Sequence, residues 1–406
     1  MEEFDIAIIG GGAAGMMAAI ACREKNTILI EKTSKLGRKL LLTGGGRCNI
    51  TNNKPIKALL NSYQDKNFLK HSFYTLTNES LLKMFEDKGL TFIEEDDNRV
   101  FPETEKSESV LKVLHEYLRD TVEIRYNTDV FSVERDNDSY IINNEIKASK
   151  VIIATGGITY PETGSSGGGY SLTNQPLTPV KWGLVPLIAN YHFENFAGIQ
   201  LYDVSVSYND KSYDGDVLIT HDGLTGPAIL NISNDISKDV NYNLLDEVGL
   251  KLDDVEISID LLPQSNAEEL REKFSKDFQQ KGKTYLKNYL KMYLVNSFIP
   301  FFLEHNGIDG EVNLANMTKE NTIKLIESFK ETTLRIDGFN AQVSKITIGG
   351  IAIDSIDSKT MESLENEGLY FAGEILEPVG PTGGYNLKIA FSTGYLAGRS
   401  AAESLG

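Results

Sequence analysis

The feature that most constrains the fold is a glycine run between a strand pattern and a helix pattern near the start of the chain. Phe4–Ile9 reads FDIAII, the apolar, β-branched composition of a buried parallel strand. Residues 10–15 read GGGAAG, which is G-x-G-x-x-G, and a helix-like segment, MMAAIACREK, follows. A second apolar run, Thr27–Ile30, ends at Glu31. This order predicts a dinucleotide-binding βαβ unit.

Each position of this unit has a chemical reason. Gly10 permits the tight turn, Gly12 lets the backbone approach a pyrophosphate, and Gly15 lets the helix pack closely on the strand. The helix N-terminus offers free N–H groups and a partial positive charge to phosphates. Glu31 stands where a carboxylate accepts ribose hydroxyls. Because that carboxylate would repel a 2′-phosphate, the site suits FAD or NAD rather than NADP.

The loop after Glu31 favours FAD. Residues 36–52 read LGRKLLLTGGGRCNITN, a glycine-dense, cationic stretch along which an extended FAD would run towards its ring system. Arg38 and Lys39 are expected to meet phosphates or the flavin edge, and Arg47 to bind an anion or the flavin. Cys48 has no cysteine partner nearby in the sequence, so we interpret it as structural rather than redox-active.

A second flavin signal lies near the end of the chain. Residues 368–376 read GLYFAGEIL, a strand followed by Gly373 and Glu374, whose carboxylate is expected on the ribitol hydroxyls. Gly383 and Gly384 then precede a helix pattern over residues 388–405. The N-terminus of that helix would face the flavin pyrimidine ring and stabilise the anionic reduced form.

The predicted cofactor is therefore FAD, with NAD(P)H as a transient electron donor. Val130 is expected at the adenine, and Thr155, Gly156 and Gly157 follow a strand that returns beside the cofactor. The complete set of predicted FAD contacts is Gly10, Gly12, Ala13, Ala14, Gly15, Glu31, Lys32, Gly37, Arg38, Lys39, Thr43, Gly44, Gly46, Arg47, Cys48, Asn49, Val130, Thr155, Gly156, Gly157, Gly373, Glu374, Gly383, Gly384, Tyr385, Asn386 and Leu387.

These stretches resemble a bacterial FAD-dependent flavoprotein family that includes aminoacetone oxidase and bile-acid dehydro-reductases. The similarity rests on IAIIGGGAAGMMAA, GRKLLLTGGGRCNITN, NRVFPETEKSESV, IIATGGITYPETGSSGGGY, ITHDGLTGPAIL, ITIGGI, YFAGEIL and GPTGGYNLKIA, which span almost the whole chain. The resemblance implies FAD, three domains and an oxidoreductase role, without a substrate. The chain departs from the family's pattern at Gly168, where a carboxylate is often found, near Leu364, and over residues 376–380.

The predicted fold class is α/β: a two-dinucleotide-binding, glutathione-reductase-like FAD domain with a β-rich insert and a small helical insert. Residues 1–189 and 337–406 form the FAD domain, 190–262 the β-rich domain and 263–336 the helical domain. Residues 54–120 read as largely helical, and residues 121–149 as a small antiparallel layer. Ser265 to Glu268 reads as an S-x-x-E capping box that opens the helical insert.

Two residues are candidates for proton transfer. Tyr160 follows the Thr155–Gly157 turn, where its hydroxyl can donate a proton to a substrate or orient it. His221, in a turn of the β-rich insert, has a side chain suited to proton transfer near neutral pH. For each, a packing or hydrogen-bonding role in a turn remains open. No metal-ligand spacing and no nucleophile motif is present, so no metal is predicted.

Composition limits the classes of partner. The formal charge of −18 lacks the basic footprint of nucleic-acid binding, except in residues 271–291, which we interpret first as a solvated helix face. No apolar run reaches the length of a membrane helix. Two cysteines, Cys22 and Cys48, make no disulfide framework. We therefore expect a cytoplasmic protein with a small-molecule substrate and no membrane, and the acidic charge disfavours nucleic acid as a partner.

The predicted function is an FAD-dependent oxidoreductase. It transfers a hydride between flavin and a small organic substrate, with NAD(P)H or O2 as the second partner. Two alternatives stay open: a flavin-dependent tRNA-modifying enzyme, which the basic stretch would serve, and a non-catalytic flavin-binding sensor or scaffold.

Overall fold

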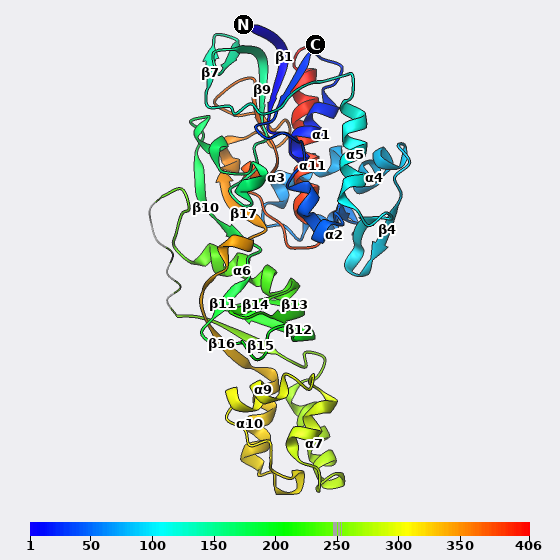
Figure 1. Ribbon diagram of the computed structural model, residues 1–406, viewed down its shortest axis with the longest axis vertical. Coiled ribbons are helices and arrows are strands. Elements are labelled where there is room, and N and C mark those ends of the chain that lie inside the picture. Colours follow the sequence, from blue (N-terminus) through cyan, green and yellow to red (C-terminus); the bar gives the residue numbers. More distant parts are fainter. Residues whose placement is uncertain (247–249, 251, 253) are drawn as a thin grey trace. The chain divides into compact units, whose positions relative to one another are not determined.

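The computed structural model describes residues 1–246, 250, 252 and 254–406 (Figure 1). Its contacts divide the chain into two compact units. The first comprises residues 1–182, 243–247 and 345–406, and the second comprises residues 183–242 and 248–344. The N-terminal and C-terminal segments therefore fold together in the first unit.

The first unit is built on a seven-stranded sheet of order β6-β2-β1-β9-β8-β7, with β18 paired to β9. β1 is parallel to β2 and β9, and β18 is parallel to β9, so the core of the sheet is of the parallel, Rossmann type. The β7–β8–β9 meander forms an antiparallel layer, as predicted, but β6, which lies in the same predicted range, pairs in parallel with β2. The strands are β1 Glu2–Ile9, β2 Thr27–Ile30, β6 Glu123–Arg125, β7 Val133–Asp136, β8 Ser139–Ile142, β9 Ile146–Ile153 and β18 Leu369–Phe371.

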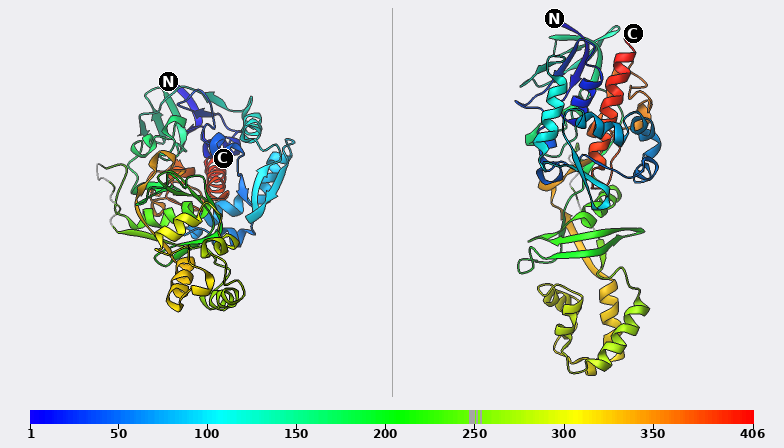
Figure 2. Two further views of the ribbon diagram at one scale, coloured as in Figure 1. Left: turned by 60° about the horizontal axis from the view of Figure 1, so that its bottom comes forward. Right: turned by 90° about the vertical axis from the view of Figure 1, so that its right-hand side faces the viewer.

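Two helices from opposite ends of the chain pack side by side in this unit: α1 (Ala13–Ala21) and α11 (Tyr385–Glu403) (Figure 1; Figure 2, right). Glycines in α11 allow backbone contact between them. A Cβ at Gly394 would lie 2.2 Å from the Ala14 carbonyl oxygen, and one at Gly398 would lie 2.1 Å from that of Ala18. The close approach fixes the last helix against the helix that opens the cofactor motif.

The segment between β2 and β6 is mainly helical, as predicted, but it also contains a three-stranded sheet of order β3-β5-β4. Two further strands, β10 and β17, pair with each other. The helices are α2 Ile56–Leu60, α3 Lys66–Thr75, α4 Asn78–Glu86 and α5 Ser107–Leu118; the strands are β3 Thr51–Asn52, β4 Phe92–Glu95, β5 Arg99–Pro102, β10 Leu177–Gly183 and β17 Ile346–Ile351.

The second unit contains a closed barrel of order β11-β14-β13-β12-β15-β16, packed against helix α6. The β-rich insert was predicted from residue 190, whereas the unit begins at Gly183. The reason is that the short strand β11 pairs with both β14 and β16 and so belongs to the barrel. The elements are β11 Leu187–Ala189, β12 Gln200–Tyr208, β13 Lys211–Ile219, β14 Gly223–Thr225, β15 Val255–Asp260, β16 Thr332–Phe339 and α6 Pro227–Asp239.

A helical segment is inserted between β15 and β16: α7 Ala267–Gln280, α8 Leu286–Tyr289, α9 Ile299–His305 and α10 Lys319–Lys330. Its capping box lies one residue later than predicted. Asn266 accepts from the backbone N–H of Glu269, and the Glu269 carboxylate accepts from the N–H of Asn266. Asn caps a helix as well as Ser does, so the shift preserves the chemistry. None of the helices in the described residues is long and apolar enough to cross a membrane.

Candidate cofactor site

The glycine turn between β1 and α1 is shaped by two close backbone contacts. Gly10 has φ +104°, and a Cβ there would lie 2.5 Å from the Ala154 carbonyl oxygen. A Cβ at Gly15 would lie 1.8 Å from the Gly10 carbonyl oxygen. A Cβ at Gly12, in contrast, would meet no atom within 4 Å. Gly12 therefore borders open space at the N-terminus of α1, which is where a pyrophosphate would be held.

Glu31, directly after β2, is 8% exposed and is held by the backbone. One carboxylate oxygen accepts from the Gly11 N–H at 2.9 Å, and the other accepts from the Thr33 N–H at 2.7 Å. These two bonds fix the carboxylate beside the glycine turn and leave it lone pairs for ribose hydroxyls. Its position suits the ribose contact predicted from the sequence.

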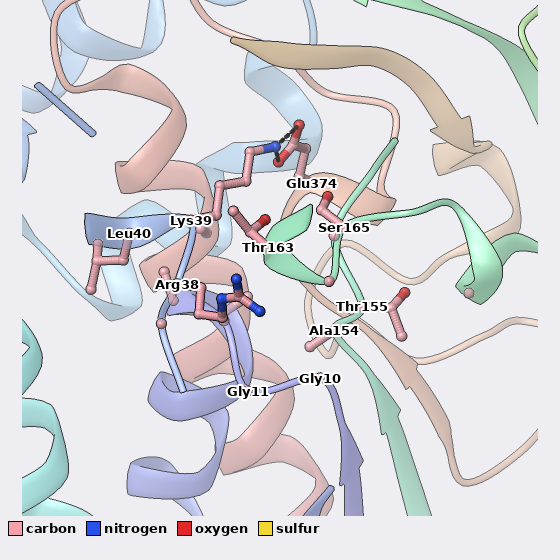
Figure 3. A pocket seen from close by; sticks show the side chains of 18 of the residues that line it. Gly10, Gly11, Arg38, Lys39, Leu40, Ala154, Thr155, Thr163, Ser165 and Glu374 are labelled. Atoms are coloured by element: carbon pink, nitrogen blue, oxygen red, sulfur yellow. Dashed lines mark hydrogen bonds and ion pairs between the residues drawn. The ribbon is translucent and has the colours of Figure 1, made fainter. Parts of the chain in front are cut away.

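A groove of about 1400 Å³, open mouth included, runs from the glycine turn through the first unit (Figure 3). It is lined by segments that lie far apart in the sequence, because the parallel strands end at the same edge of the sheet. Of the predicted cofactor residues, the lining brings together Gly10, Gly12, Ala13, Ala14, Glu31, Lys32, Gly37, Arg38, Lys39, Thr43, Val130, Thr155, Gly156, Glu374, Asn386 and Leu387.

The other predicted contacts lie outside this lining: Gly15, Gly44, Gly46, Arg47, Cys48, Asn49, Gly157, Gly373, Gly383, Gly384 and Tyr385. Several shape the backbone around the groove instead. A Cβ at Gly157 would lie 2.0 Å from the Thr347 hydroxyl, and one at Gly384 would lie 2.4 Å from the Thr51 backbone. Contact between these residues and the flavin stays a prediction.

Arg47 is held by two carboxylates. It pairs with Glu95, and its Nη2 lies 2.9 Å from Oε1 of Glu105. Its guanidinium also lies 4.1 Å from the ring centre of Phe101. The Glu95 pKa is lowered by the hydrogen bond from Arg47. The charge of Arg47 is thus already engaged, which favours a structural role for it in this loop.

The groove contains a buried side-chain hydroxyl that has no hydrogen-bond partner among the described residues. This is the hydroxyl of Thr155, two residues after the end of β9. A buried hydroxyl left in this state is costly, and a ligand that donates to it or accepts from it removes the cost. Together with the open space at Gly12, this orphan hydroxyl fits a bound dinucleotide.

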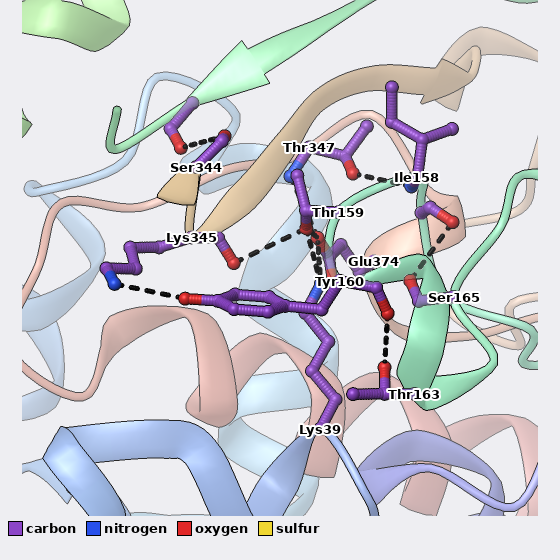
Figure 4. A network of polar contacts seen from close by, with 12 residues as sticks. Lys39, Ile158, Thr159, Tyr160, Thr163, Ser165, Ser344, Lys345, Thr347 and Glu374 are labelled. Atoms are coloured by element: carbon purple, nitrogen blue, oxygen red, sulfur yellow. Dashed lines mark hydrogen bonds and ion pairs between the residues drawn. The ribbon is translucent and has the colours of Figure 1, made fainter. Parts of the chain in front are cut away.

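Across the groove, Lys39 and Glu374 form an ion pair of 2.6 Å (Figure 3). Glu374 also accepts from the backbone N–H of Thr347 at 2.8 Å and from the Thr159 hydroxyl at 3.3 Å. The network continues to the predicted proton donor Tyr160, whose hydroxyl lies 3.0 Å from Lys345 Nζ (Figure 4). Charged and hydroxyl groups thus meet on one side of the groove.

The two candidates for proton transfer lie on different units. Tyr160 is in the first unit, with a left-handed backbone conformation of φ 59°. His221 is exposed in the turn between β13 and β14 of the second unit. Hydrogen bonds through Lys345 and Thr159 join Tyr160 to the polar network of the groove.

Sequence reasoning missed Thr159, Lys345 and Thr347, although all three take part in this network. Thr347 lies within ITIGGI, a stretch already singled out by its resemblance, and Lys345 stands just before it. One signal could have indicated them. The strand that returns to the cofactor domain is otherwise buried, yet polar residues stand at its start.

A groove at the first turn of α1, in a sheet wound in this way, is where dinucleotide cofactors bind, and the protein is of the class of FAD-dependent oxidoreductases. The family model described as "HI0933-like protein Rossmann domain" matches residues 4–400, and the chain belongs to this family. The resemblance predicted from the motifs is confirmed, as are the Rossmann-type fold and FAD as cofactor.

Three relatives match over nearly their whole length. A ribosomal RNA dihydrouridine synthase of Haemophilus influenzae is 31% identical over 406 residues, covering 96% of each chain. One of Escherichia coli is 28% identical, covering 97% of each chain. A 3-dehydro-bile acid delta(4,6)-reductase of Clostridium scindens is 30% identical, covering 98% of this chain and 99% of its own.

Proposed function

We propose that this enzyme reduces a carbon–carbon double bond conjugated to a carbonyl group, with NAD(P)H as the source of the electron pair. The observation that carries the proposal is a chemistry common to the three relatives. A dihydrouridine synthase saturates the uracil double bond beside a carbonyl, and a 3-dehydro delta(4,6)-reductase acts on double bonds conjugated to a ketone. The bond type is therefore the same although the molecules differ.

We assign separate roles in cofactor binding and proton donation to residues of the first unit. When bound, FAD supplies the acceptance and delivery of a hydride. The turn at Gly12 and the carboxylate of Glu31 hold the adenine-nucleotide half of the cofactor. Saturation of a double bond also needs a proton, and the Tyr160 hydroxyl, hydrogen-bonded to Lys345, is the group proposed to donate it.

The second partner follows from the direction of the reaction. Reduction of a substrate consumes an electron pair, which NAD(P)H can provide as a transient donor that need not stay bound. O2, the other partner considered from the sequence, would then reoxidise the enzyme only when no organic acceptor is present.

Two substrate classes follow from the relatives. A small ketone-conjugated compound matches the sequence-based prediction and the bile-acid reductase. A uracil base in ribosomal RNA is the second candidate, favoured by the two dihydrouridine synthases. It replaces the tRNA named in our sequence-based alternative. The relatives lend no support to the non-catalytic sensor or scaffold.

The test is anaerobic flavin spectroscopy on the purified protein. NADH or NADPH should bleach the flavin, and a ketone-conjugated alkene or uridine-containing ribosomal RNA should restore its colour. Mass spectrometry should then show the gain of two hydrogen atoms in the acceptor. If a bleached flavin is reoxidised by neither acceptor class, the proposed reaction is wrong.

A further inference from the structure

The helical segment of the second unit concentrates positive charge in an acidic protein. Residues 271–291 contain seven Lys and Arg and two Asp and Glu, whereas the whole chain carries a formal charge of −18. We call the lysine side chains of this stretch the basic strip: Lys273, Lys276, Lys281, Lys283, Lys287 and Lys291.

Contacts join α7 to the helical turns that follow it, and they bring two lysines of the strip together. Lys281 Nζ lies 3.6 Å from the sulfur of Met292 and 5.7 Å from the ring centre of Tyr289. Lys273 Nζ lies 4.7 Å from the ring centre of Tyr293. The Tyr289 and Tyr293 hydroxyls are 3.0 Å apart. Lysines from the start and end of α7 thus converge on one aromatic cluster.

Part of the strip's charge is available to a partner. Lys281 is paired with Asp277 at 3.5 Å, and Lys287 with Glu311 at 2.5 Å. Within the described part of the chain, Lys276, Lys283 and Lys291 are exposed and form no ion pair. Unpaired exposed cations of this kind bind phosphates and release their counterions.

An exposed aromatic ring lies beside another lysine of the strip, Lys287. Tyr285 is 44% exposed, and Lys287 Nζ lies 5.9 Å from its ring centre. Met292, next to Lys291, is 57% exposed. Lysines interleaved with an exposed aromatic and an apolar side chain form the combination that holds single-stranded nucleic acid, with phosphates on the cations and bases on the ring.

We propose that the basic strip binds single-stranded RNA, with Tyr285 stacking on a base. The choice of RNA over other polyanions rests on the proposed function, in which uracil in RNA is one substrate class. An anionic lipid surface or an acidic protein would satisfy the lysines but offer no base to Tyr285. Because the chain as a whole repels polyanions, the strip is the surface on which such a ligand would gather.

The experiment measures binding of a fluorescein-labelled, uridine-rich single-stranded RNA to the holoenzyme across a salt series. The strip variant is Lys276→Glu/Lys283→Glu/Lys291→Glu. Its control, Lys57→Glu/Lys70→Glu/Lys112→Glu, makes the same charge change at exposed lysines of the first unit. In the strip variant, the magnitude of the slope of log affinity against log salt should fall by about 2, and the affinity should be at least about tenfold weaker. In the control variant, both the slope and the affinity should stay at the wild-type values.

Tyr285 is tested separately. Tyr285→Ala should weaken RNA binding about tenfold, whereas Tyr285→Phe should retain it, because stacking needs the ring and not the hydroxyl. An unchanged affinity and salt slope in the strip variant would overturn the proposal. Equal or stronger binding to phosphatidylserine vesicles than to RNA would overturn it too.

Reduction of a small ketone-conjugated alkene, measured on the same samples, separates the two proposals. If the wild-type enzyme reduces the alkene but binds no RNA, the proposal that the basic strip binds RNA is wrong and the proposed reaction stands. If the enzyme binds RNA through the strip but reduces neither acceptor, the proposed reaction is wrong and the RNA-binding proposal stands.

Discussion

Lys39 and Glu374 stand 335 positions apart in the sequence, yet they meet in a 2.6 Å ion pair inside the cofactor groove. Their side chains are 21% and 23% exposed. Lys39 comes from the loop after β2 and Glu374 from the turn after β18, so the pair joins the two chain ends that carry the flavin signals. Both residues line the groove in which we expect FAD to bind.

Glu374→Gln should lower the affinity for FAD about tenfold, because the carboxylate loses its charge while the shape of the side chain is kept. The measurement is a titration of apoprotein with FAD, followed by flavin fluorescence. Glu365→Gln, at an exposed site, is the matched control. Equal FAD affinity in the Glu374 and Glu365 variants would remove Glu374 from the cofactor contacts.

Gly12→Val should abolish FAD binding and leave the fold intact. The backbone at Gly12 has φ −77° and ψ −171°, which any residue adopts, and no atom lies within 4 Å of its added Cβ. The valine side chain would fill the space assigned to the pyrophosphate. FAD content is read from the absorbance of the purified protein, and folding from circular dichroism.

Gly15→Val supplies the contrast, because its Cβ would lie 1.8 Å from the Gly10 carbonyl oxygen. That variant should lose the fold itself. A folded Gly12→Val protein with normal FAD content would show that the pyrophosphate is bound elsewhere.

The βαβ unit at the start of the chain was predictable because its signals are local. The strand, the glycine turn, the helix and Glu31 follow one another within the first 31 residues. The same reasoning pointed to Gly373 and Glu374, since a strand ending in a glycine and an acid is again a local pattern, and of the two Glu374 lines the groove. Both predictions needed only short-range chemistry.

The side-chain contacts around the groove could not be predicted, because they depend on partners far away in the sequence. Arg47 binds Glu95 and Glu105, 48 and 58 positions on, and Tyr160 binds Lys345, 185 positions on. No periodicity or spacing marks such pairs, because they form only when the sheet brings its strand ends together. The barrel boundary was missed for a similar reason: β11 has three residues, too few to show an alternating pattern.

Lys388 should make the stability depend on pH. This lysine of α11 is fully buried and donates a hydrogen bond to the Leu76 carbonyl. Burial lowers its pKa from the ordinary 10.5 to about 7. Between these two values the unfolded chain binds more protons than the folded one. The free energy of unfolding therefore rises with pH there, by up to about 1.4 kcal/mol per pH unit.

Below the folded-state pKa both states carry the proton, and the full penalty for burying the charge is present. Lys388→Met, similar in size and without a charge, should remove this pH dependence. Urea unfolding of apoprotein at several pH values within the window compares the slopes. Parallel slopes for the wild type and Lys388→Met would contradict the assignment.

Both cysteines should be inert in the folded protein. Burial raises the pKa of Cys22 to about 11 and that of Cys48 to about 12, and the two side chains are 1% and 0% exposed. Because the thiolate is the reactive form, neither should react with Ellman's reagent until denaturant is added. Cys48→Ala should also keep the reduction of flavin by NAD(P)H. Rapid labelling of Cys48 in the native protein would contradict this prediction and would support a redox role for that thiol.

Tyr160→Phe should separate proton donation from reduction of the cofactor. The variant keeps the ring and loses the hydroxyl that accepts from Lys345 at 3.0 Å. FAD content and bleaching by NAD(P)H should be unchanged, while reduction of a ketone-conjugated alkene should slow by about a hundredfold or more. Lys345→Met should shift the pH profile of that step, since Lys345 acts through the Tyr160 hydroxyl. His221→Asn, on the second unit, should react at the wild-type rate. The opposite pattern, with Tyr160→Phe active and His221→Asn inactive, would move the proton donor to the second unit.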